Sequence, residues 1–338
     1  MLKIVKIQTF LYLCRMKFKE IIAPIEPAFQ KFKQEFSNVM TSEVALLDDV
    51  FKHIQASQGK QIRPVLILLS AEICGGITPK TYRSAVSTEM LHLGTLLHDD
   101  VIDQAEMRRN QPSVNAKWDS KVAILVGDYL FAETLKTLTA HKDYGILELI
   151  NEAVKKVSEG ELTQMQNTAN VEVSEDIYYD IIDKKTASLF AAACACGAFS
   201  ADTTQENVTT FHQIGWHLGM AFQIKDDLLD LLPSAETGKT KGNDIHEQKL
   251  TLPLIHFLKI ASETDKKTAL NIVQNHYLDI EKIQQLSQQI LDSESLAYTE
   301  SQISEHIEKA RVLLNPFPDC VGKTTLQNLM NFIAVRNH

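Results

Sequence analysis

The chain has 338 residues, of which 44% are hydrophobic and 23% charged, and its formal net charge is −9. These values exclude a disordered or collagen-like chain, and the acidic balance excludes a basic nucleic-acid-binding surface and a polybasic membrane patch. No apolar run approaches the roughly 18 residues of a membrane-spanning helix. The cysteines form no paired metal-binding motif, so we expect reduced thiols and a cytoplasmic protein. They are Cys14, Cys74, Cys194, Cys196 and Cys320.

Residues 1–15 differ in composition from the rest of the chain. Lys3, Lys6 and Arg15 surround a short apolar patch, but no small-residue cleavage site follows, so a signal peptide is not expected. An amphipathic sequence of ordinary polarity begins at Met16. We expect residues 1–15 to be a peripheral extension or a misassigned start, and residues 16–338 to form a single domain.

Long helices are predicted for most of the chain. The 13 glycines and 9 prolines are about half the usual share of these residues, and 113–232 holds no proline. Apolar residues recur at spacings of three and four, as at Val122, Leu125, Val126 and Tyr129, and no alternating strand pattern is present. We therefore expect an all-α domain of ten or more helices. Short polar connectors are expected at 74–80, 104–115, 168–176 and 233–243.

Two acidic motifs of the form DDxxD lie at 99–103 and 226–230, each after an apolar helical stretch. Residues four apart share one helix face, so each motif projects a cluster of carboxylates. A single motif of this kind is more often a solvated surface, but two copies at the ends of apolar helices favour hard-oxygen ligands for Mg²⁺ shared with a diphosphate. The six candidate ligands are Asp99, Asp100, Asp103, Asp226, Asp227 and Asp230.

Basic residues flank the two motifs. Most isolated lysines and arginines are ordinary surface groups, but Arg108 and Arg109 follow the first motif by only five residues. The guanidinium group is a planar fork that matches phosphate oxygens, so we expect both to contact a diphosphate beside the metal. The other basic candidates are Lys60, Arg63, Lys184, Lys185, Lys239, Lys241 and Lys249.

Further polar residues continue the same helix faces. His92 and Thr95 precede Asp99 by seven and four residues, and Gln223 precedes Asp226 by three. A lone histidine among leucines is more often a core residue with a satisfied hydrogen bond. The shared face makes this core interpretation of His92 less strongly preferred.

The segments GKQIRP, LHLGTLLHDDVID, MRRNQPSVN, GDYLF, EGEL, KKTASLF, FQIKDDLLD and GKTKGNDIHEQKLTLP occur in this order over residues 59–253. In this order they resemble the trans-isoprenyl diphosphate synthase family, also called polyprenyl synthetases. The resemblance implies an isoprenoid synthase helical bundle around a central cavity, usually a homodimer. It also implies a transferase that joins isopentenyl diphosphate to an allylic diphosphate with three Mg²⁺ ions per site. Peripheral contact with a membrane would serve product release.

The resemblance also implies individual roles. Asp99, Asp103 and Asp226 would ligate Mg²⁺, and Asp100, Asp227 and Asp230 would complete the clusters directly or through water. Isopentenyl diphosphate would be bound by Lys60, Arg63, His92 and Arg109, and the allylic diphosphate by Arg108, Lys185, Lys239 and Lys249. Thr186 and Gln223 would face the developing cation and act with Lys185 in catalysis. The chain departs from the family pattern at Gln58 and Gln61, where glycine and a basic residue are common.

Product length is expected to depend on Gly94 and Thr95, five and four residues before Asp99. Short-chain family members commonly place aromatic rings at these positions, so two small residues indicate a long all-trans product of about C40–C50, of octaprenyl or solanesyl type, for a quinone side chain. Gly94 has an alternative role in close helix packing, and Phe131 or Leu135 could close the tunnel.

Other functions stay open. The alternatives are a short-chain C15–C20 synthase and the catalytic subunit of a heteromeric synthase. A terpene cyclase and a non-catalytic subunit fit less well, because the second motif is DDLLD, followed by Lys239 and Lys249, and because both motifs and the cations are intact.

Overall fold

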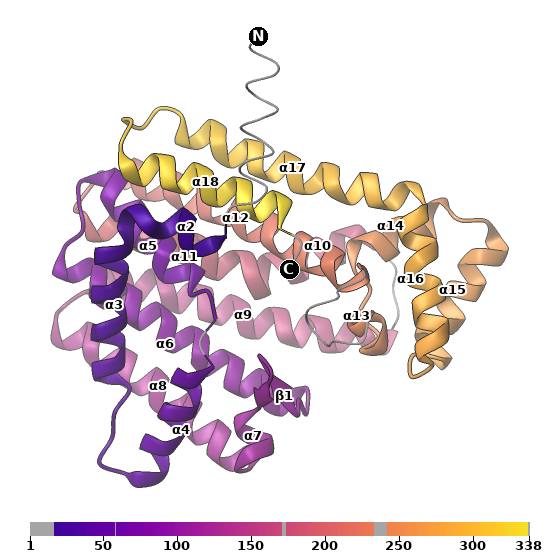
Figure 1. Cartoon of the computed structure of the whole chain (residues 1–338), viewed down its shortest axis with the longest axis horizontal. Helices are drawn as coiled ribbons and strands as arrows, with labels where there is room; N and C mark the ends of the chain where they lie inside the picture. The colour runs from indigo at the N-terminus through magenta and orange to yellow at the C-terminus, as the bar shows by residue number, and fades with distance from the viewer. Residues whose placement is uncertain (1–16, 58, 171–173, 233–241, 337–338) are drawn as a thin grey trace.

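The computed structural model describes residues 17–57, 59–170, 174–232 and 242–336, and its architecture is helical, as predicted (Figure 1). Residues 1–15 and Lys239 therefore lie outside the described residues, and the division into residues 1–15 and one domain stays a prediction. The elements before the first acidic motif are α2 (Phe18–Ile22), η1 (Ala23–Ile25), α3 (Glu26–Val39), α4 (Ala45–Ala56), α5 (Ile62–Cys74) and α6 (Pro79–Ile102). Two short strands, β1 (Met107–Arg108) and β2 (Gln111–Pro112), and α7 (Val114–Lys117) follow.

The centre of the chain supplies the long helices. They are α8 (Ser120–Ala140), α9 (Tyr144–Asn170), α10 (Glu175–Ile182), the π-helical turn η2 (Asp183–Ala187), α11 (Ser188–Ser200) and α12 (Gln205–Leu231). The C-terminal part consists of α13 (Asn243–His246), α14 (Leu252–Ile260), α15 (Glu263–Asn275), α16 (Ile280–Asp292), α17 (Glu294–Leu314) and α18 (Val321–Val335). In the described chain no helix combines the length and the apolar composition that crossing a membrane requires.

The core is centred on α11, which is packed by α5, α6, α9 and α12. This helix is apolar or small on every side, the pattern of a helix with no solvent-facing surface. Its small residues let neighbours approach closely: a Cβ added at Gly197 would lie 2.3 Å from the carbonyl oxygen of Ile67 on α5. Cys194 and Cys196 are completely buried free thiols within this helix.

The predicted connector at 104–115 contains a small antiparallel hairpin. Arg108 of β1 pairs with Gln111 of β2, and Arg109 and Asn110 between them adopt left-handed backbone conformations. Each strand has only two residues, too short for an alternating pattern to show in sequence. The hairpin turns the chain back immediately after the first acidic motif.

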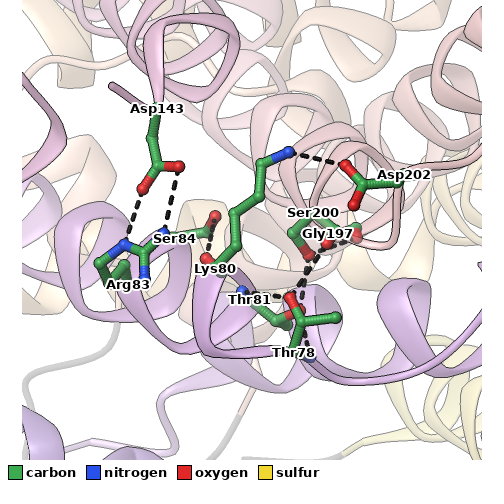
Figure 2. Close-up of polar contacts among 9 residues, drawn as sticks. All are labelled: Thr78, Lys80, Thr81, Arg83, Ser84, Asp143, Gly197, Ser200 and Asp202. Carbon is green, nitrogen blue, oxygen red and sulfur yellow. Dashed lines mark hydrogen bonds and ion pairs between the residues drawn. The ribbon is translucent and has the colours of Figure 1, made fainter. Parts of the chain in front are cut away.

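The beginning of α6 is fastened to α11 and to the loop between α8 and α9 by polar contacts (Figure 2). The Thr81 and Ser200 hydroxyl groups lie 2.7 Å apart, and the Thr78 hydroxyl donates to the Ser200 carbonyl oxygen. The Arg83 guanidinium makes two hydrogen bonds with the buried Asp143 carboxylate, at 2.7 and 3.2 Å. These contacts anchor the end of α6 opposite the acidic motif.

A smaller core joins α14, α15 and α16, and it includes Leu231 and Ile245 from the segment before them. These helices lie together at one end of the molecule (Figure 1). At the C-terminus, α18 packs on α5 and α12. This packing brings residue 336 next to the end of α12.

Candidate active site

The first acidic motif occupies the last turn of α6. Asp100 is 2% exposed, and both of its carboxylate oxygens lie 2.7 Å from Nε of Arg108 on β1. Asp103 ends the helix, and its backbone N–H donates to the carbonyl oxygen of Asp99. The hairpin therefore places Arg108 in direct contact with Asp100 of the motif.

The second motif occupies the last turns of α12. Asp226 pairs with Arg336 at 2.6 Å. Asp227 is buried and accepts hydrogen bonds from the Tyr178 hydroxyl at 2.6 Å and the Gln223 amide at 2.8 Å. The carboxylate of Asp230 accepts the backbone N–H of Asp244 at 2.9 Å. Each carboxylate of this motif thus has a different environment.

Both motifs contain carboxylates with raised pKa values. Burial raises the pKa of Asp99 to about 6, and the nearby charges of Glu161 and Asp103 add to the effect, while Lys185 opposes it. Burial likewise raises the pKa of Asp227 to about 6 despite its hydrogen bonds with Tyr178 and Gln223. At both carboxylates, burial outweighs the groups that lower the pKa.

Two lysines lie between the motifs. Lys185 Nζ is 2.5 Å from Glu161 Oε2, and its charge acts on both Asp99 and Asp103. Burial alone would lower the pKa of Lys249, but contact with Glu247 and the charges of Asp244 and Asp103 raise it to about 12.

Hydrogen bonds through Gln223 connect Thr186 to the second motif. The Thr186 hydroxyl donates to Gln223 Oε1 at 2.6 Å, and the Gln223 amide nitrogen donates to Asp227. A cavity of about 240 Å³ lies beside these groups, lined by Lys185, Lys249 and apolar side chains of α10 and α14. The cavity therefore has one apolar wall, formed by isoleucines of α10 and α14, and polar or charged side chains around the rest.

The remaining candidate cations form a separate cluster beside the motifs. Arg63 donates to His92 Nε2 at 2.9 Å and lies over the Phe190 ring. Burial, followed by the charges of the neighbouring arginines, holds the pKa of His92 well below 6.5, so His92 is neutral. Burial also lowers the pKa of Arg63 to about 10, a value at which it remains charged at neutral pH.

Lys60 and Arg109 border this cluster. Lys60 Nζ is 5.1 Å from the centre of the Phe332 ring on α18. The Arg109 guanidinium donates to the Ser57 carbonyl oxygen at 3.2 Å and covers Gly59, where an added Cβ would lie 2.6 Å from Cζ of the arginine. The absence of a side chain at Gly59 therefore makes room for Arg109.

At the chain-length positions, the space above Gly94 holds an aromatic ring from another helix. A Cβ added at Gly94 would lie 2.6 Å from Cε1 of Phe131 on α8. The Thr95 hydroxyl donates to the His92 carbonyl oxygen at 2.8 Å, within its own helix. Gly94 thus permits close packing of α6 and α8, and of the two tunnel-closing candidates Phe131 is the one that packs on it, whereas Leu135 is 45% exposed.

Four site residues were not among the sequence-based candidates. Arg336 is buried and pairs with Asp226. Asp244 and Tyr178 make hydrogen bonds with the second motif, and Glu161 pairs with Lys185. Glu161 lies in the EGEL segment, so its motif was visible although its role was not. Arg336 is 110 residues from Asp226 in sequence, and no local pattern connects them.

A family model described as "Polyprenyl synthetase" matches residues 44–290. The chain belongs to the polyprenyl synthetase family. It is therefore a prenyl diphosphate synthase, a transferase of prenyl groups, as the resemblance implied.

Individual relatives and structures agree with this family assignment. The chain is 33% identical to an all-trans-nonaprenyl-diphosphate synthase from Rhodobacter capsulatus, over 92% of this chain and 95% of the relative. It is 29% identical to heptaprenyl diphosphate synthase component 2 from Bacillus subtilis, over 95% and 91% respectively. The structure of a polyprenyl synthase from Caulobacter crescentus, complexed with calcium and isoprenyl diphosphate, superposes with a TM-score of 0.90 at 28% identity, over 95% of this chain and 98% of that chain. The relatives are named for products of different length, so the family alone does not select the product.

Proposed function

We propose that this synthase condenses isopentenyl diphosphate with an allylic diphosphate, using Mg²⁺, to make a long all-trans polyprenyl diphosphate of about C40–C50. One observation carries the proposal. The charges of Lys185 and Lys249 act on carboxylates of the first motif, and both lysines line a cavity together with Asp227 of the second motif. A second group of cations surrounds Arg63. These two groups of cations support one binding site for each diphosphate.

The carboxylates fit Mg²⁺ by their chemistry. All six candidate ligands are hard oxygen donors, and arginine side chains stand beside two of them, Arg108 on Asp100 and Arg336 on Asp226. In the described ranges, no three Asp, Glu, His or Cys side chains are already grouped around one ion position. We infer that Asp99, Asp103 and Asp226 hold three ions together with the substrate diphosphate, completed by Asp100, Asp227 and Asp230.

The allylic diphosphate is assigned to the cations nearest the carboxylates, Arg108, Lys185 and Lys249, with Lys239. Mg²⁺, when bound, supplies Lewis-acid stabilisation of the departing diphosphate. The lysines and Arg108 add fixed positive charge in a site partly shielded from water. Because the Thr186 hydroxyl donates a hydrogen bond to Gln223, the lone pairs of the Thr186 oxygen can face the allylic cation.

Isopentenyl diphosphate is assigned to Lys60, Arg63, His92 and Arg109. The hydrogen bond between neutral His92 and Arg63 orients the guanidinium without adding a competing charge. Holding the isopentenyl double bond close to the allylic cation favours condensation over capture by water. The proton lost at the end of condensation passes to the released diphosphate.

The product tail is proposed to run back along α6 from Asp99, past Gly94. The twenty residues from Asp99 to Pro79 span roughly 30 Å, about the length of six isoprene units. Phe131 has to rotate away from Gly94 for the tail to pass. A longer tail leaves the bundle near the polar contacts of Figure 2, so a C40 product extends beyond α6.

A homodimer is proposed through α8. This helix exposes Ile124, Leu125, Tyr129 and Leu135, with exposed fractions from 37 to 67%. A second copy of the chain would cover these side chains by isologous contact. The alternative, a heteromer, has its counterpart in the relative named component 2.

Product analysis of the purified chain tests the proposed function. The chain, Mg²⁺, farnesyl diphosphate and radiolabelled isopentenyl diphosphate are incubated, and the products are separated by chromatography. We expect C40–C50 products, and Asp99→Ala or Asp226→Ala should lose at least several kcal/mol of transition-state stabilisation. A dominant C15 or C20 product would contradict the long-chain assignment. Inactivity of the chain alone would favour the heteromer. Light scattering of the purified chain shows whether it forms a homodimer.

A further inference from the structure

The π-helical turn η2 carries Lys185 and Thr186 and lies between α10 and α11. Its widened geometry is shown by the Ser188 backbone N–H, which donates to the carbonyl oxygen of Asp183, five residues earlier. A π turn inserts one extra residue into a helix, is rare, and occurs mostly at functional sites. Contacts outside the turn are therefore needed to hold it.

Helix α12 contacts both ends of this turn. At the start, the Trp216 indole N–H donates to Asp183 Oδ1. Near the end, the Thr186 hydroxyl donates to Gln223. Trp216 and Gln223 are seven residues apart, close to two helical turns, so one face of α12 makes both contacts.

Two glycines, one on each side of the turn, let the neighbouring helices approach it closely. A Cβ added at Gly160 on α9 would lie 2.7 Å from Cβ of Lys184 and 2.8 Å from Cγ of Lys185. A Cβ added at Gly219 on α12 would lie 2.5 Å from Cα of Ala187. The backbone of the turn is therefore packed between α9 and α12, and Trp216 fixes the residue at which it begins.

Trp216 is outside the diphosphate-binding cavity. Its ring packs against His306 of α17, with centroids 5.5 Å apart, and borders an outer groove between α12 and α17. Trp216 is linked to the turn that carries Lys185 and Thr186 by its hydrogen bond with Asp183.

We propose that Trp216 and Asp183 are positioning residues whose hydrogen bond sets the register of the π turn and thereby aims Lys185 and Thr186. This inference rests on the proposed function, because Lys185 is assigned there to the allylic diphosphate. If the turn rewinds into a regular α-helix, a shift of one residue rotates a side chain by about 100° around the helix axis. Lys185 Nζ, which now lies 2.5 Å from Glu161 Oε2 and acts on the charge of Asp99, would leave this position.

Steady-state kinetics of paired variants test the proposal. Trp216→Phe keeps an aromatic ring against His306 but removes the indole N–H, and Asp183→Leu removes the acceptor. Each should raise the KM for the allylic diphosphate at least fivefold and leave the KM for isopentenyl diphosphate within twofold. Asp183→Asn retains an acceptor oxygen and should restore the parent KM. The double variant Trp216→Phe/Asp183→Leu should be no worse than either single variant, because both remove the same bond.

The chain's other tryptophan, Trp118, supplies the matched control. Trp118 packs against His53, away from η2, so Trp118→Phe should leave both KM values unchanged. Equal changes in both KM values, an Asp183→Asn variant as impaired as Asp183→Leu, or additive losses in the double variant would each overturn the proposal.

Fluorescence separates this inference from the proposed function. The Trp118→Phe protein contains Trp216 alone, so its emission reports directly on the indole environment. In that background, Asp183→Leu should shift the emission and Asp183→Asn should not. If the parent chain alone forms no product, the proposed homodimeric synthase fails, and this comparison still tests the bond. Identical emission from the Leu and Asn variants would overturn it.

Discussion

Replacing Asp99 by asparagine should make the metal-free protein more stable while abolishing its activity. Burial beside Glu161 and Asp103 raises the pKa of Asp99 from 3.8 to about 6. One pKa unit corresponds to about 1.4 kcal/mol, so keeping this carboxylate ionised in the folded protein costs on the order of 3 kcal/mol. Asparagine keeps the shape of the side chain and removes the charge.

The sign of the pH dependence follows from the raised pKa. Between pH 3.8 and about 6 the folded state binds more protons at Asp99 than the unfolded state does. The free energy of unfolding therefore decreases through this window as pH rises, and the full cost is present above pH 6. We expect Asp99→Asn to gain up to about 3 kcal/mol at pH 8 and almost nothing at pH 4.

Urea unfolding followed by far-UV circular dichroism, with EDTA present, measures this gain. Asp49→Asn on α4 is the matched control, because Asp49 is an exposed carboxylate and its substitution should change stability by less than about 0.5 kcal/mol. Adding Mg²⁺ and inorganic pyrophosphate should stabilise the parent protein more than the variant. An Asp99→Asn protein no more stable than the parent at pH 8, with an unchanged denaturant slope, would refute the electrostatic reasoning.

Further substitutions test the tail path, the division of the arginines and the C-terminal cation. Gly94→Phe should shorten the product and Phe131→Ala should lengthen it, because a Cβ added at Gly94 would lie 2.6 Å from Cε1 of Phe131. Reverse-phase chromatography measures the product lengths, and unchanged lengths would exclude this path. Arg108→Ala should raise the KM for the allylic diphosphate and Arg109→Ala the KM for isopentenyl diphosphate, each by about tenfold or more. Steady-state kinetics that show equal effects on both constants would contradict the assignment of one arginine to each substrate. Arg336→Met removes the cation paired with the second motif and should tighten Mg²⁺ binding severalfold in calorimetry with pyrophosphate present, whereas an unchanged affinity would show that this arginine does not compete with the metal.

The helical architecture and the two acidic motifs could be predicted from sequence because both depend on local periodicity. The 3.6-residue repeat decides which side chains share a face, so Asp99 and Asp103 could be grouped without coordinates. The same reasoning placed Gln223 on the face of Asp226. The family resemblance then implied an activity that the family model supports.

Contacts between helices could not be predicted in this way. The pairing of Arg336 with Asp226 joins residues 110 apart, and it forms because α18 packs on α12. Phe131 lies over Gly94 because α6 and α8 approach closely where a side chain is absent. The small residues at 94 and 95 indicated free space beside this helix, but the aromatic ring that fills the space at Gly94 belongs to another helix.

The sequence by itself determined the fold class, the positions of the carboxylate motifs and the kinds of cation available, because these follow from residue type and helical spacing. Only the tertiary structure decided which cation stands on which carboxylate, where Lys185 points and what closes the space beside Gly94. The π turn at η2 illustrates the difference: its sequence, DKKTA, resembles ordinary helix, and its extra residue is accommodated by Trp216, Gly160 and Gly219 from neighbouring helices. Periodicity orders side chains within one helix, whereas distances between helices depend on how side-chain volumes pack across the interface.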